Sequence, residues 1–95
     1  MTNIFQETLA KNLKIIRNNK NLTQFELAGL CETSTNYIAL IETCKKFPSS
    51  NMLSKLVDVL NIEPFELFLT QNILKKEVDK NLLKKEINKL IDKIL

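Results

Sequence analysis

A short stretch near the middle of the chain constrains the fold most strongly, because two helices must begin there in quick succession. Thr23 is followed three residues later by Glu26, the spacing of a capping box in which each side chain binds a free backbone N–H at a helix start. Ser34 can cap a second helix. Pro48 ends any helix before it. The spacing therefore predicts two short helices separated by a turn at residues 31–33.

The second of these helices has different chemistry on its two sides. Ile38 and Ile41 lie three residues apart and form its buried side. Thr35 and Asn36 place small polar side chains on the first turn of its outer side. Two helices in this order can bring the start of the second one against the edges of DNA bases. The segment is thus typical of a helix-turn-helix, and DNA binding becomes the leading hypothesis.

Apolar residues at helical spacing predict further helices around this pair. The first runs from residue 2 or 3 to residue 19, and Asn21 ends it because asparagine adopts the left-handed conformation at lower cost than most residues. A fourth helix is capped by Ser49 or Ser50 and ends at Asn61 in the same way.

A short fifth helix is expected where Pro64 stands at a favourable first position. It covers the five residues that follow. Phe65, Leu67 and Phe68 are expected to close the core from this helix. The resulting prediction is an all-α, five-helix domain over residues 1–69.

The last part of the chain, residues 70–95, is rich in lysine and has the pattern of one long amphipathic helix. Its first apolar stripe consists of Leu74, Val78 and Leu82. Its second stripe, with heptad spacing, consists of Leu83, Ile87, Leu90 and Ile94. We expect the first stripe to pack on the domain and the second to form a homodimer, because these residues would otherwise make an exposed patch. The alternative is a helix folded wholly onto its own domain.

The net charge of +3 belongs entirely to the end of the chain. Residues 1–73 hold seven basic and seven acidic residues, whereas residues 74–95 hold seven lysines and four acidic residues. The predicted domain is therefore not basic as a whole. A neutral domain with one basic face can still bind phosphates, but we expect its non-specific affinity for DNA to be modest.

Composition argues against an enzyme, a metal site or a cofactor. The chain has no histidine, which removes the usual general base and the commonest transition-metal ligand. Cys31 and Cys44 are too few and too widely spaced for a zinc site. Gly29 is the only glycine, so there is no glycine-rich phosphate loop. Compact helices of this size leave little room for a small-molecule effector, and none is expected.

Targeting signals are not evident either. No apolar run approaches the roughly 18 residues that a membrane span needs. The amino terminus lacks the basic-then-apolar layout of a signal peptide. We therefore expect a cytoplasmic location with no membrane partner, and no disulfide in that reducing compartment.

The chain from about residue 9 to residue 68 resembles the helix-turn-helix family of phage Cro and repressor proteins, the xenobiotic-response-element (XRE) regulators. The resemblance is carried by Leu22-Thr23-Gln24, Glu26-Leu27-Ala28, Ser34, Ile38, Glu42, Pro48-Ser49 and Glu66-Leu67-Phe68. It implies a lambda-repressor-like five-helix fold. It also implies a sequence-specific transcriptional regulator that reads the DNA major groove with the helix at residues 34–43.

The resemblance also implies roles for individual residues. The base-reading residues would be Ser34, Thr35, Asn36, Tyr37 and Leu40. The phosphate contacts would be made by Gln24, Thr43, Lys45 and Lys46. Arg17 and Glu42 would form an ion pair between the first and third helices. Asn36 is the best candidate for specificity, because an amide can make two hydrogen bonds to adenine. Tyr37 is equally open to a packing role.

Several positions depart from the family pattern. Glu32 stands in the turn where glycine is frequent, and Cys44 stands where glycine usually follows the third helix. A left-handed conformation costs a non-glycine residue roughly 1–2 kcal/mol, so a rearranged turn is expected. The third helix has no arginine or lysine before Lys45 and thus lacks the commonest guanine contact. We expect moderately specific reading biased toward A·T pairs.

Two function classes remain open at this point. The first is a dimeric repressor or controller protein that reads a palindromic operator on double-stranded DNA. The second is a protein-interaction or antitoxin-like module that uses the C-terminal helix and binds DNA weakly or not at all. The neutral domain, the apolar Leu40 and the amphipathic tail favour the second class.

Overall fold

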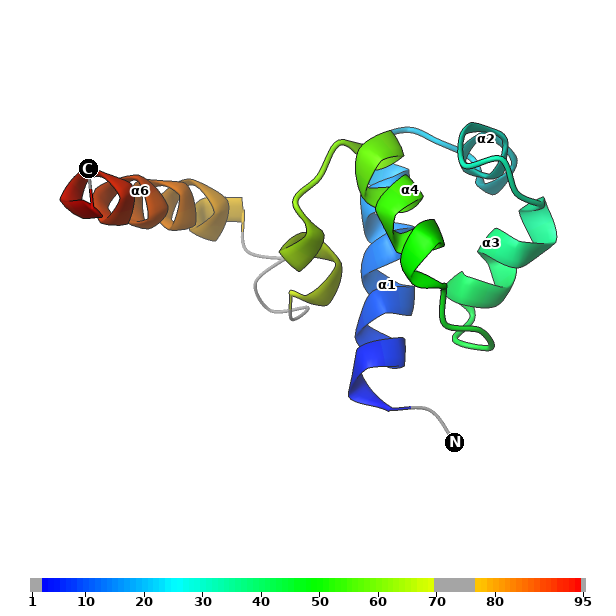
Figure 1. Ribbon diagram of the computed structural model, residues 1–95. Helices are drawn as coiled ribbons and strands as arrows, with labels where there is room; N and C mark the ends of the chain where they lie inside the picture. The colour runs from blue at the N-terminus through cyan, green and yellow to red at the C-terminus, as the bar shows by residue number, and fades with distance from the viewer. Residues whose placement is uncertain (1–2, 70–76, 95) are drawn as a thin grey trace.

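The computed structural model describes residues 3–69 and 77–94, with the side chains of the second range described from residue 84 to residue 93. Every regular element in these ranges is helical (Figure 1). The elements are α1 (Ile4–Asn19), α2 (Gln24–Leu30), α3 (Thr35–Glu42), α4 (Ser50–Leu60), the 3₁₀ helix η1 (Pro64–Phe68) and α6 (Glu77–Ile94). The all-α fold class predicted from the sequence is confirmed.

The body of the protein, from α1 to η1, has one apolar core to which each helix contributes. Its most deeply buried apolar side chains include Leu9, Leu13, Leu27, Ile38, Ile41, Leu56, Leu60 and Leu67. α3 packs on both α1 and α2, and η1 packs on α1 (Figure 1). Burying one such side chain is worth roughly 1.5–3 kcal/mol before the cost of ordering it. One side of α3 is therefore buried in the core, and its other side lies at the surface.

Side-chain caps fix the residues at which the helices begin. The hydroxyl of Thr23 accepts a hydrogen bond from the Glu26 N–H, and the Glu26 carboxylate accepts one from the Thr23 N–H, both at 3.0 Å. The predicted capping box is thus present, and its backbone hydrogen bond from Thr23 lowers the pKa of Glu26. The side chain of Ser34 caps α3, as predicted. Ser49, rather than Ser50, caps α4.

The first four helices all end with one residue in the left-handed conformation. These residues are Asn21 (φ 59°), Glu32 (φ 56°), Cys44 (φ 65°) and Asn61 (φ 54°). In each case the next residue donates its N–H to the carbonyl five residues earlier, at 2.9–3.2 Å. This is the Schellman pattern, which satisfies carbonyls that the helix end leaves unpaired. The two asparagines end their helices as predicted.

The expected rearrangement of the turn between α2 and α3 was wrong. Glu32 keeps the left-handed conformation although it carries a Cβ. Thr33 donates its N–H to the carbonyl of Ala28 at 2.9 Å, and Glu32 donates its own to Gly29 at 3.2 Å. These two bonds close the turn and outweigh the local strain, so α3 follows α2 without distortion.

The prediction that Phe65 and Phe68 close the core was also wrong. Their side chains are 49% and 39% exposed, whereas Leu67 is 1% exposed. In a 3₁₀ helix, residues three apart lie on the same side, so Phe65 and Phe68 share the outer side of η1. Phe68 meets the Phe5 ring edge-on there, with 6.4 Å between ring centroids.

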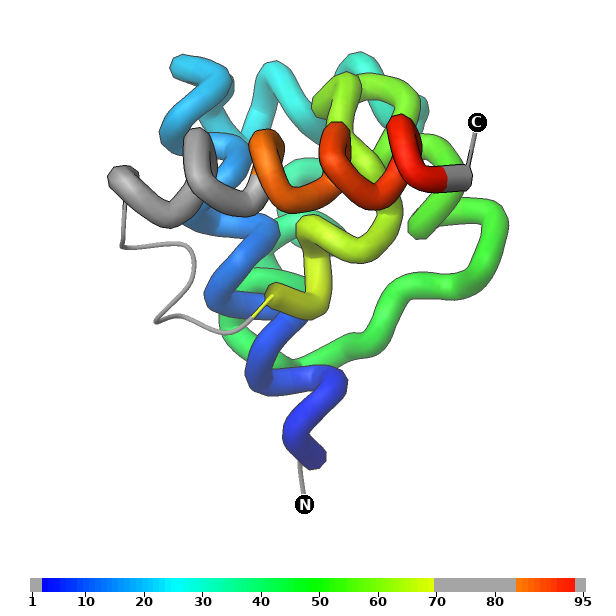
Figure 2. Tube along the Cα trace, turned by 90° about the vertical axis from the view of Figure 1, so that its left-hand side faces the viewer, coloured from blue at the N-terminus to red at the C-terminus, as the bar shows by residue number. Residues whose placement is uncertain are grey.

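α6 lies to the left of the body in Figure 1, and in Figure 2, where that side faces the viewer, it lies in front of the body. Its described apolar side chains are exposed: Ile87 by 41%, Leu90 by 58% and Ile91 by 44%. Ile87 and Leu90 belong to the predicted dimerisation stripe, whereas the side chains of Leu83 and Ile94 lie outside the described residues. The stripe predicted to pack on the body lies outside them as well. Within the described ranges no helix is long and apolar enough to cross a membrane.

The strain at Glu32 can be measured by substitution. We expect Glu32→Gly to raise the free energy of unfolding by about 1 kcal/mol, because glycine adopts the left-handed conformation without a Cβ penalty. Chemical denaturation monitored by circular dichroism measures the change. Glu32→Ala is the matched control, since it removes the carboxylate and keeps the Cβ, and it should give no comparable gain. Equal gains in both variants would show that the side chain, not the backbone, carries the strain.

Candidate nucleic-acid interface

The first turn of α3 presents polar side chains to solvent. Thr35 and Asn36 are exposed, and the Asn36 amide has no hydrogen-bonding partner among the described residues. Ser34 is exposed too, but its hydroxyl oxygen accepts the Tyr37 N–H at 3.0 Å and caps the helix. The first backbone N–H groups of a helix have no partner within the helix. The Asn36 amide is therefore free to bind a ligand, whereas the Ser34 hydroxyl is already engaged in capping the helix.

Tyr37 and Leu40 are half-buried, so α3 presents them only in part. The Tyr37 ring packs against the core, and the Lys46 ammonium lies 5.6 Å from its centroid in a cation–π contact. The N–H groups of Lys45 and Lys46 both donate to the Leu40 carbonyl, at 2.9 and 3.1 Å. Tyr37 thus has a packing role and holds a cation beside α3.

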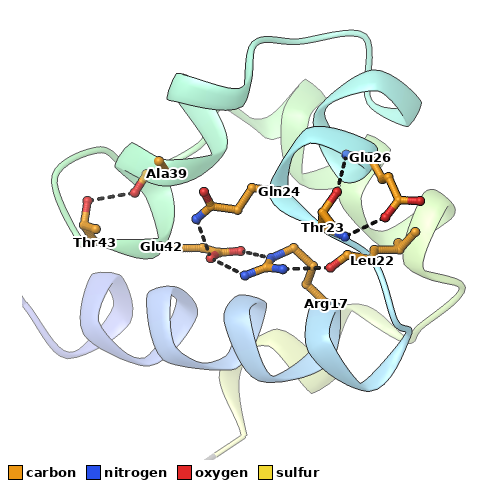
Figure 3. A network of polar contacts seen from close by, with 8 residues as sticks. All are labelled: Arg17, Leu22, Thr23, Gln24, Glu26, Ala39, Glu42 and Thr43. Carbon is orange, nitrogen blue, oxygen red and sulfur yellow. Dashed lines mark hydrogen bonds and ion pairs between the residues drawn. The ribbon is translucent and has the colours of Figure 1, made fainter.

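Arg17 and Glu42 join α1 to the end of α3 through two hydrogen bonds (Figure 3). The Arg17 Nε donates to Glu42 Oε2 at 2.7 Å and its Nη2 donates to Oε1 at 3.0 Å. A third bond runs from Arg17 Nη1 to the Leu22 carbonyl at 2.7 Å, just before α2. The side chains are 9% and 2% exposed, and hydrogen bonding to Glu42 raises the pKa of Arg17 against the opposing effect of burial. Bidentate geometry of this kind is the strong form of an ion pair.

Gln24, at the first position of α2, belongs to the same network. Its Nε2 donates to Glu42 Oε1 at 3.0 Å, so one carboxylate oxygen serves both α1 and α2 (Figure 3). An amide nitrogen has two hydrogens, which leaves one for another acceptor. Thr43 differs, because its hydroxyl donates to the Ala39 carbonyl at 2.7 Å. A phosphate contact through the Thr43 hydroxyl proton would have to break that bond.

Asn12 is a buried polar residue whose role the sequence did not reveal. Its side-chain nitrogen donates to the carbonyls of Leu67 at 2.9 Å and Leu69 at 2.7 Å, and its side chain is 0% exposed. It thereby fixes the end of η1 against α1. The signal in the sequence is an asparagine three residues after Leu9, on the apolar side of α1.

The remaining reactive side chains do not form a chemical site. In the part of the chain that the structure describes, no cluster of three acidic or cysteine residues is placed to hold a metal ion. Cys31 is buried, and desolvation raises the pKa of its thiol, which suits a core residue. The described body therefore offers a polar surface at α3 rather than a reaction centre.

Comparisons with known proteins identify this arrangement. The helix-turn-helix family model matches residues 13–67. The restriction-modification controller protein C.AhdI from Aeromonas hydrophila is 32% identical, covers 66% of this chain and 96% of its own, and superposes with a TM-score of 0.64. The chain belongs to the XRE-type helix-turn-helix family. This membership makes it a DNA-binding transcriptional regulator and not an enzyme.

Two further solved structures are similar. The hypothetical transcription factor NHTF from Neisseria is 25% identical over 72% of this chain and 78% of its own, with a TM-score of 0.67. The clp gene regulator ClgR from C. glutamicum is 27% identical over 66% of this chain and 82% of its own, with a TM-score of 0.62. No curated protein sequence matches the chain significantly.

The Arg17–Glu42 pair predicts an unequal effect of single and double substitution. We expect Arg17→Leu to lower the free energy of unfolding by about 3 kcal/mol, because it leaves the Glu42 carboxylate buried without its partner. The double variant Arg17→Leu/Glu42→Leu should be more stable than the single one, since it leaves no unpaired charge. Urea denaturation of both variants measures this. A double variant that is less stable than the single one would contradict it.

Proposed function

We propose that the chain is a dimeric repressor or controller protein that reads a palindromic operator by placing α3 in the DNA major groove. The observation that carries this proposal is the exposed first turn of α3, with a free Asn36 amide on a helix anchored by Arg17 and Glu42. The fixed helix supports a defined orientation, and the free amide supports base reading. The similarity to a restriction-modification controller protein supports the choice of regulator class.

The proposed contacts follow from the chemistry of each side chain. Asn36 makes two hydrogen bonds to adenine, and Thr35 packs on a thymine methyl group. Ser34, Tyr37 and Leu40 complete the base-reading surface, with Tyr37 and Leu40 contributing only the parts that the core leaves exposed.

Phosphate contacts flank this surface. Gln24 donates its second Nε2 hydrogen from the start of α2, a position suited to anions. Lys45 and Lys46 follow α3 and are exposed. Thr43 contributes only if its hydroxyl leaves the Ala39 carbonyl. These few contacts on a body of zero net charge favour a dimer over a monomer as the binding unit.

In this proposal the C-terminal helix α6 forms the dimer interface, and the body of residues 1–69 binds DNA. The exposed Ile87 and Leu90 of α6, together with Leu83 and Ile94 on the same heptad stripe, meet a second copy. Two bodies spaced about 34 Å apart would read half-sites one helical turn apart. The regulator acts on DNA in the cytoplasm and needs no small-molecule effector.

The exposed apolar face of α6 also supports a second candidate, a protein-interaction or antitoxin-like module. Selection from a randomised DNA duplex pool at moderate salt separates the two. We expect a palindromic consensus biased toward A·T pairs. No enrichment by a well-folded protein would favour the interaction module instead, because residual binding would then be a salt-sensitive background.

The assignment of Asn36 is tested on the selected site. Asn36→Ala should lose the preference for adenine at one position of each half-site, worth roughly 1–3 kcal/mol of discrimination. Asn18→Ala, which removes an exposed asparagine amide from α1, is the matched control and should keep the consensus. Titration of labelled duplexes that differ at single positions gives both values. A consensus that depends on guanine and survives Asn36→Ala would contradict the assignment.

A further inference from the structure

An apolar groove of about 420 Å³ lies between α4 and η1, on the body but away from α3. Leu53 and Val57 line it from α4, and Leu67 and Phe68 line it from η1. Engineered cavities of about 150 Å³ hold a ligand the size of benzene, so this groove has room for two or three apolar side chains. The outward position of Phe68 on the 3₁₀ helix helps to form its wall.

The groove has one acidic residue in its lining. Asp58 lies in its lining and is exposed, and no cation forms an ion pair with it among the described residues. Glu66 lies in η1 and Glu63 stands immediately before it, so residues 50–68 carry three acidic residues against one lysine, Lys55. An occupant with apolar side chains and positive charge would match both properties.

α6 has this combination of properties. Ile87 and Ile91 lie three and seven residues after Lys84, which places the three side chains on one side of the helix, and Leu90 extends the apolar part. The apolar members are exposed, and α6 carries five lysines against four acidic residues. The apolar side chains of this face match the apolar lining of the groove, and Lys84 supplies a positive charge that matches the Asp58 carboxylate.

We propose that α6 of one copy docks in the α4–η1 groove of a second copy, reciprocally, with Lys84 facing Asp58. The inference rests on the dimeric part of the proposed function and names its interface. A two-fold exchange covers two α6 faces and two grooves, whereas pairing α6 with α6 leaves both grooves open and relies on barely two heptads.

Charge reversal tests this arrangement without touching the core. Asp58→Lys and Lys84→Glu change exposed residues, and each should weaken the dimer about tenfold, because a repulsion replaces an attraction at both symmetry-related contacts. An equimolar mixture of the two variants should recover the wild-type affinity, since each groove then meets an α6 of opposite charge. Lys85→Glu, with the same charge change on another side of α6, is the matched control and should dimerise normally. Analytical ultracentrifugation at low salt, without DNA, compares these samples with the wild type and with the doubly substituted chain Asp58→Lys/Lys84→Glu.

The outcomes separate the possible arrangements. Wild-type dimerisation of Asp58→Lys, with or without an effect of Lys84→Glu, would overturn docking in the groove and leave a dimeric regulator possible. Rescue in the doubly substituted chain but not in the mixture would overturn exchange, because α6 would then dock on its own body. A wild-type protein that stays monomeric would overturn the inference together with the dimeric part of the proposed function. An intact dimer that enriches no DNA site would contradict the proposed function alone.

Discussion

Two hydrogen bonds between Arg17 and Glu42 set the position of α3, because they fasten the end of that helix to α1 inside the body. The same carboxylate holds Gln24 at the start of α2, and the same guanidinium holds the Leu22 carbonyl. Both charged side chains are nearly buried, so either one without the other would be costly. The network therefore joins α1, the start of α2 and the end of α3 through one pair of charged side chains. It thereby fixes the orientation in which α3 presents its polar first turn.

The ends of the helices complete this arrangement. Left-handed residues at Asn21, Glu32, Cys44 and Asn61 stop each helix and turn the chain toward the next one. Asn12 fixes the end of η1 in a different way: its side-chain nitrogen donates hydrogen bonds to the carbonyls of Leu67 and Leu69 and so joins that end to α1. The outer side of η1 is consequently left to form a groove wall with α4, while α3 remains free at a different part of the surface. One compact body thus offers two separate surfaces, one polar and one apolar.

Local features were predictable from the sequence because their causes are local. The capping box at Thr23 and Glu26 and the cap at Ser34 each depend on residues within one helical turn. Phe65 and Phe68 were misplaced because the 3₁₀ geometry of η1 changes which residues share a side. The prediction for the turn at Glu32 was wrong because backbone hydrogen bonds stabilise the turn, and the types of the residues do not indicate these bonds. Likewise, the hydrogen bonds of Asn12 join residues more than fifty positions apart. The exposure of Asn36 fits its expected role, and the roles of the DNA-contacting residues remain predictions.

The central claim is that the buried carboxylate of Glu42 orients the DNA-reading helix, and it can be measured directly on Glu42→Gln. This variant keeps the shape of the side chain and removes its charge. At a temperature where it remains folded, we predict that its preference for the selected operator over a duplex with one changed base in each half-site falls about tenfold, while its affinity for unrelated DNA stays near that of the wild type. A folded Glu42→Gln protein with undiminished preference would contradict the account.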